Sequence, residues 1–140
     1  MIKELIHNDE EFLAKPAEPA TAEDAQVAQD LLDTMKARKN CACLAANQIG
    51  STKAVIAFCD EKDRVVVMFN PRVKAGMRPY RVEESCLSLD EPHTVTRYFT
   101  IRVAYEELVD GALVARTRRY EDFVAQAIQH AIDHCNGRLV

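Results

Sequence analysis

The sequence QHAIDH, residues Gln129 to His134, carries two histidines four positions apart. On an α-helix such a spacing places the two imidazoles one turn apart on the same face, within reach of a single metal ion. A helix is indeed expected from about residue 120 to 136, with Gly137 as its stop. Phe123 and Ala127 extend the face of His130 and His134 at helical spacing, so we expect all four side chains to point toward the core.

The histidine pair has two interpretations. In the first, His130 and His134 are ordinary core histidines that hydrogen-bond to the backbone, which is the commoner fate of an isolated H-x-x-x-H pattern. In the second, they share a metal ion. A shared cation removes the repulsion between two charged imidazoles and supplies the partner that two buried neutral ones would need. Asp133 offers an acceptor that could fix one imidazole tautomer.

A third ligand has to come from elsewhere in the chain, and Cys86 is the best candidate. It lies in Glu84-Ser-Cys-Leu-Ser88, directly after an expected strand that could direct its side chain at the last helix. The alternative is a buried structural thiol. Cys41 and Cys43 form a C-x-C pattern, which is a weak metal signal without a second pair.

The remaining elements predict an α+β fold in a single domain, residues 1–140. Thr21 and Asp24 form a capping-box pattern that starts one N-terminal helix. Residues 53–71 read as a hairpin around an acidic turn, and residues 98–120 as a second hairpin that turns at Asp110-Gly111. The order helix, strands, helix favours antiparallel β-sheets packed around a C-terminal metal-binding helix.

Composition limits the functional classes. The formal charge of −4 argues against a nucleic-acid binder, and no apolar stretch approaches the roughly 20 residues that span a membrane. Five cysteines with no apparent secretory signal indicate a reducing compartment, so we expect the protein to be cytoplasmic.

Three separated motifs resemble those of the peptide deformylases. They are Leu44-Ala-Ala-Asn-Gln48 followed by Ile49-Gly50, then Glu84-Ser-Cys-Leu-Ser88, and finally Gln129-His-Ala-Ile-Asp-His134. The resemblance covers essentially the whole chain. It implies hydrolysis of the N-formyl group from formyl-methionyl peptides, including nascent chains, by a monomer or homodimer. It also implies one divalent metal ion, Fe²⁺ or Zn²⁺ with Ni²⁺ in some members, held by Cys86, His130 and His134 with water in the fourth position.

The same resemblance implies roles for further residues. The amide of Gln48 and the backbone N–H of Leu87 would stabilise the developing oxyanion. Arg97 would pair with Glu84 near the site, and Asp133 would support the histidines. Cys41 and Cys43 replace glycines of the family motif, but the backbone of Cys43 stays available to the substrate peptide. The substrate-binding residues would be Cys43, Val82, Phe123 and Ala127.

Ala131 is the main departure from the family. The resemblance places a glutamate there as the general base, and losing such a base costs about 10²–10⁴ in rate. Neither Gln126 nor Asp133 is expected to project at the angle needed to replace it. Either the glutamate was deliberately substituted, or the chain is a natural homologue that has lost it.

Three functions therefore have to be distinguished. The first is a deformylase with strongly impaired turnover. The second is a catalytically inactive, deformylase-like protein that binds formylated N-termini. The third is a structural metalloprotein, in which His93 or Cys43 supplies a fourth ligand.

Overall fold

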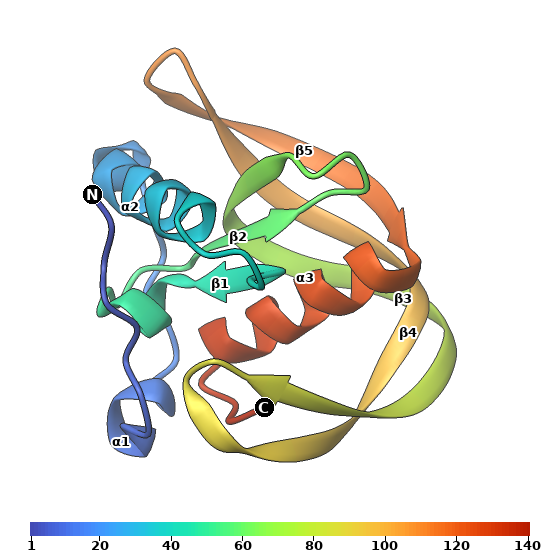
Figure 1. Ribbon diagram of the computed structural model, residues 1–140. Helices are drawn as coiled ribbons and strands as arrows, with labels where there is room; N and C mark the ends of the chain where they lie inside the picture. Colours follow the sequence, from blue (N-terminus) through green and yellow to red (C-terminus); the bar gives the residue numbers. More distant parts are fainter.

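The computed structural model describes residues 1–140, and its centre is a single antiparallel sheet that curves around the last helix (Figure 1). The helix is α3, Asp122–Cys135. The strands follow one another in sequence order across the sheet. They are β1 (Cys43–Ala45), β2 (Val55–Cys59), β3 (Val65–Cys86), β4 (Leu89–Val109) and β5 (Ala112–Glu121). The α+β fold is thus confirmed, with both predicted hairpins in the same sheet.

The turns of the two hairpins lie where the sequence predicts them. β2 and β3 pair from Val55↔Phe69 to Cys59↔Val65, across the acidic turn. β4 and β5 meet at Asp110 and Gly111, which have φ angles of 49° and 80°. A two-residue turn with both residues at positive φ matches the twist of the flanking strands, which explains the Asp-Gly pair.

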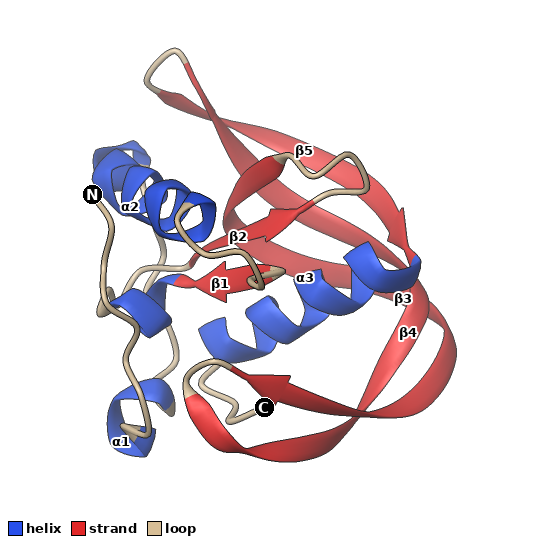
Figure 2. Ribbon diagram, viewed as in Figure 1, coloured by secondary structure: helices blue, strands red, loops and turns tan.

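The N-terminal region contains more structure than the sequence predicts. Thr21 and Asp24 form the expected capping box, which opens a 3-10 turn, Ala22–Asp24, that leads directly into α2, Ala25–Lys36. A short helix α1, Glu10–Leu13, precedes it and was not predicted. In Figure 2, α1 and α2 lie at the outer edge of the fold, whereas α3 lies among the strands.

Strand β1 separates two apolar clusters because successive residues of a strand point to opposite faces. Ala45 joins the cluster between the sheet and α3, whereas Leu44 joins the cluster under α2. Fully buried members of the first cluster include Ile56, Phe58, Met68 and Ile128. The second includes Leu31 and Val55. β1 then runs into a 3-10 turn, Ala46–Ile49, which carries Gln48.

Helix α3 has the predicted extent, but not all of the side chains that were expected to point toward the core do so. Gly137 follows its end with φ of 77°, and Ala127, His130 and His134 are buried. Phe123 is 64% exposed, so its expected place in the core is wrong. It lies in the first turn of α3, in which Val124 and Ala125 contact the apolar cluster instead. None of the helices is long and apolar enough to cross a membrane.

Candidate metal centre and active-site cavity

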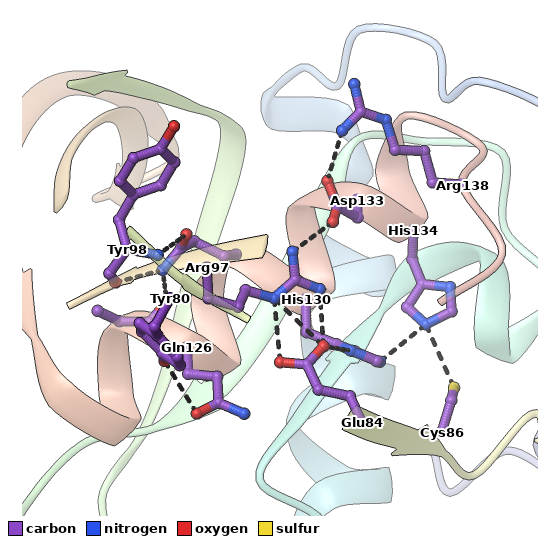
Figure 3. A network of polar contacts seen from close by, with 12 residues as sticks. Tyr80, Glu84, Cys86, Arg97, Tyr98, Gln126, His130, Asp133, His134 and Arg138 are labelled. Carbon is purple, nitrogen blue, oxygen red and sulfur yellow. Dashed lines mark hydrogen bonds and ion pairs between the residues drawn. The ribbon is translucent and has the colours of Figure 1, made fainter. Parts of the chain in front are cut away.

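Three potential ligand atoms converge between the end of β3 and helix α3 (Figure 3). Nε2 of His134 lies 3.2 Å from Sγ of Cys86 and 3.1 Å from Nε2 of His130. Cys86 is the last residue of β3, and the tight connection to β4 begins there, with Leu89 opposite it. The long β3 strand thus brings the thiol to the histidine face of α3, as the sequence suggested.

The donor set fits a divalent metal ion. Ligands about 2.0–2.3 Å from a tetrahedral ion lie roughly 3.3–3.6 Å from one another, close to the separations seen here. Nδ1 of His130 lies 2.8 Å from the carboxylate of Glu84. An ionised carboxylate accepts hydrogen bonds and cannot donate them, so Nδ1 carries the proton. In a neutral imidazole this leaves the lone pair on Nε2, the atom that faces Cys86 and His134.

The carboxylate that orients His130 belongs to Glu84, not to Asp133. Nη2 of Arg97 donates to Glu84 at 2.7 Å, so the expected ion pair of these two residues is present. Asp133 instead accepts from Nη1 of Arg97 at 2.6 Å and from Arg138 at 3.3 Å. The expectation that Asp133 contacts an imidazole is therefore wrong, because the two arginines engage both of its oxygens (Figure 3).

Burial and charge act in opposite directions on these groups. Burial alone would raise the pKa of Glu84, but hydrogen bonds from His130 and Arg97 outweigh it and lower that pKa to about 2. Burial would also raise the pKa of the Cys86 thiol, yet its contacts with His130 and His134 lower it to about 6. The pKa of His130 rises to about 9 because Cys86 and Glu84 overcome its desolvation. The surroundings thus favour the thiolate, the form of cysteine that binds metals.

The side-chain amide of Gln48 lies beside the three candidate ligands. Its side chain is buried, with Oε1 accepting from the Ala45 backbone N–H at 3.0 Å. Nε2 lies 3.2 Å from Oγ of Ser88 and 3.5 Å from Sγ of Cys86. A donor amide is thereby held next to the candidate metal centre. The contact with Ser88 was not predicted, because it joins residues 40 positions apart.

Comparison with known proteins identifies the family. The family model described as polypeptide deformylase matches residues 2–140. The chain belongs to the polypeptide deformylase family. It is 38% identical over 141 residues to a peptide deformylase of Clostridium beijerinckii, covering 100% of both proteins. It is 30% identical over 145 residues to peptide deformylase 3 of Shewanella oneidensis, covering 99% of this chain and 86% of that protein.

Solved structures of this enzyme family have the same fold. The class I type b peptide deformylase of Acinetobacter baumannii bound to Met-Ala-Ser superposes with a TM-score of 0.84 at 27% identity, covering 99% of this chain and 97% of that one. A peptide deformylase of Legionella pneumophila gives a TM-score of 0.82 at 30% identity, covering 99% and 83%.

A cavity of about 400 Å³ opens beside the candidate deformylase centre. Its walls include Cys86 and His130, together with Cys43, Gln48, Leu87, Phe123 and Ala127. Exposed Phe123 therefore still contributes to the cavity. Val82 is half-buried and is not among the residues that line this cavity. His93 and Cys43 are both absent from the group of ligand atoms that lie within 4.8 Å of one another, which argues against a site closed by either residue.

Sequence reasoning missed Gln126 as a cavity residue. Its position could have predicted this, because residues four apart lie on the same face of a helix and Gln126 precedes His130 by four. Ala131 lies on the neighbouring face. It is fully buried in the apolar cluster under α3 and is not part of the cavity lining. The carboxylates in that lining are Glu83 and Glu84, and Glu84 is already engaged by Arg97 and His130.

Proposed function

We propose that the chain is a metal-dependent hydrolase that removes the N-formyl group from formyl-methionyl peptides, with turnover strongly reduced by Ala131. The observation that carries the proposal is the convergence of Cys86, His130 and His134 beside a cavity, with no fourth protein ligand among them. A centre with three protein ligands keeps a coordination position for chemistry, whereas structural sites are closed by four.

We assign Cys86, His130 and His134 as ligands of one divalent metal ion, Fe²⁺ or Zn²⁺, and Ni²⁺ fits the same ligand set. When bound, such an ion supplies Lewis acidity and makes water more acidic. Glu84 holds the tautomer of His130, Arg97 holds Glu84 in turn, and Asp133 accepts a hydrogen bond from Arg97. The amide of Gln48 and the backbone N–H of Leu87 would donate to the oxyanion that develops on the formyl group.

The substrate would enter through the cavity, and its formyl-methionine would contact Phe123 and Ala127. The backbone of Cys43 would hydrogen-bond to the substrate peptide. The bound Met-Ala-Ser of the Acinetobacter baumannii enzyme supports a short peptide as the ligand. We propose nascent chains as the source of such peptides. We further propose that residues 1–140 function as one domain, as a monomer or homodimer in the cytoplasm.

Ala131 supplies no group that can take up a proton. Without a general base the rate should fall by about 10²–10⁴, while contacts made only for binding are kept. A second function is therefore a binding protein for formylated N-termini. One observation favours this second function. The chain lacks the general base but keeps Gln48, the three candidate ligands and the Glu84–Arg97 pair in contact with one another.

A single-turnover experiment tests these functions. Metal-loaded protein is mixed in excess with formyl-Met-Ala-Ser or acetyl-Met-Ala-Ser, and released formate or acetate and bound peptide are followed. Slow release of formate alone supports the deformylase. Preferential binding of the formyl peptide without formate release supports the binding protein. Equal, weak binding of both peptides contradicts both proposals.

A further inference from the structure

Gln126 lies in the active-site cavity together with Phe123, Ala127 and His130. It belongs to α3 and precedes His130 by four residues. One turn of helix separates the two side chains by about 6 Å along the helix axis. This offset is about the length of an extended side chain, so a ligand group bound beside Gln126 would lie about one side-chain length from a group bound beside His130.

A neighbouring tyrosine holds the amide of Gln126 in place. Oη of Tyr80 donates a hydrogen bond to Oε1 of Gln126 at 3.1 Å (Figure 3). The ring of Tyr80 stacks on Phe99, with centroids 4.2 Å apart and planes at 30°. Burial raises the pKa of Tyr80, so the phenol keeps the proton that it donates. The amide orientation is therefore fixed from outside the cavity.

The other end of the amide is free to recognise a ligand. With Oε1 engaged by Tyr80, Nε2 presents two N–H donors. Nε2 of Gln126 has no acceptor within the chain. A donor held in place before binding loses little conformational freedom when a ligand arrives, and it lowers affinity for any ligand that leaves it unpaired.

We infer that Gln126 determines specificity for the first residue of the substrate by donating a hydrogen bond to its side chain, with Tyr80 as the positioning residue. The inference rests on the proposed binding of formyl peptides. The ligands it favours are N-formyl peptides whose first side chain carries an acceptor near its end. A thioether sulfur is a weak acceptor and a sulfoxide oxygen a strong one, whereas a methylene group is none.

Calorimetry on metal-loaded protein provides the test, because it measures binding whether or not turnover occurs. The probes are formyl-Xaa-Ala-Ser tripeptides in which Xaa is methionine sulfoxide, as separate epimers, methionine or norleucine. We expect affinity to fall in that order for the better epimer. One hydrogen bond should give the sulfoxide peptide about a three- to tenfold advantage over the norleucine peptide.

Substitutions identify the donor. Gln126→Met removes the amide at similar volume and should reduce the advantage to about one. Gln126→Glu keeps an acceptor for Tyr80 but repels the sulfoxide oxygen, and should reverse the preference. Tyr80→Phe should reduce the advantage in part, because the amide is no longer held. Gln29→Met, on the exposed surface of α2, is the matched control and should change nothing.

Two results separate this inference from the proposed function. If Gln126→Met retains the full sulfoxide advantage while its melting temperature and its preference for formyl over acetyl peptides match the parent, Gln126 is not the donor and only the inference is wrong. If the parent binds formyl-Met-Ala-Ser and acetyl-Met-Ala-Ser equally, the formyl-peptide site itself is wrong.

Discussion

Oε1 of Glu84 lies 2.8 Å from Nδ1 of His130, and both side chains are buried. The same oxygen accepts from Nη2 of Arg97 at 2.7 Å. A strand residue therefore sets the tautomer of a helix residue 46 positions later. In metal sites such a carboxylate fixes the orientation of the imidazole and raises its basicity, so Glu84 should influence metal affinity without touching the metal.

Glu84→Gln tests this role. The amide keeps the size of the side chain but not its charge, so Arg97 loses its ion pair with Glu84 and keeps only the one with Asp133, and the tautomer of His130 is no longer imposed. Loss of such an outer contact typically costs about 10–100-fold in metal affinity. Competition with a chelator measures it. Glu83→Gln, the exposed neighbour, is the control, and equal affinities of the two variants would contradict the assignment.

Metal content and stability should depend on all three ligands. Cys86→Ala, His130→Ala and His134→Ala should each lose most of the bound metal, measured by elemental analysis of purified protein. An ion that binds only the folded state stabilises it, so chelation should lower the melting temperature of the parent but not of these variants. His93→Ala is the control. A similar loss of metal in that variant would return His93 to the ligand set.

Gln129 should contribute to stability by pairing with the edge of β4. Its Oε1 accepts from the Tyr98 backbone N–H at 3.0 Å, and its Nε2 donates to the Tyr98 carbonyl at 2.9 Å. Gln129→Met leaves both backbone groups without this partner and should lower the free energy of unfolding by about 2 kcal/mol in urea titrations. Gln129→Glu keeps the acceptor and loses the donor, so it should also lower the free energy of unfolding. An unchanged free energy of unfolding in either variant would contradict the pairing.

The parts of the fold that the sequence predicted are those with local physical signals. Thr21 and Asp24 are three residues apart, and Asp110 and Gly111 are adjacent. The residues that form the capping box and the turn are therefore close enough in the sequence to be recognised from it alone. The pairing of His130 with His134 is equally local, because one helical turn creates it.

The parts that escaped prediction depend on contacts between distant segments. Whether Glu84 or Asp133 reaches His130 is determined by the path of β3 and by the competing arginines, which sequence spacing does not report. Phe123 follows the helical period yet is exposed, because it lines the open cavity and is not part of the apolar cluster under α3. The helical angle of Gln126 predicts that it cannot replace the missing base, but this angle does not reveal that its side chain lines the same cavity.

Ala131→Glu addresses the missing general base directly. Ala131 is fully buried one turn after Ala127 and directly after His130, two residues that line the cavity. Glutamate favours helices, so α3 should persist, at some cost in packing. If the carboxylate reaches the reacting water, turnover on formyl-Met-Ala-Ser should rise by about two to four orders of magnitude with little change in substrate affinity.

Ala131→Gln is the matched control, because it introduces the same volume and shape without a base. Both variants are first checked for metal content and melting temperature, since the buried position makes some loss of stability expected. A fast glutamate variant beside a slow glutamine variant identifies proton transfer as the function that Ala131 removed. If both variants fold, bind metal and remain as slow as the parent, the site does not support deformylation, and a protein that binds formylated N-termini without cleaving them becomes the better description.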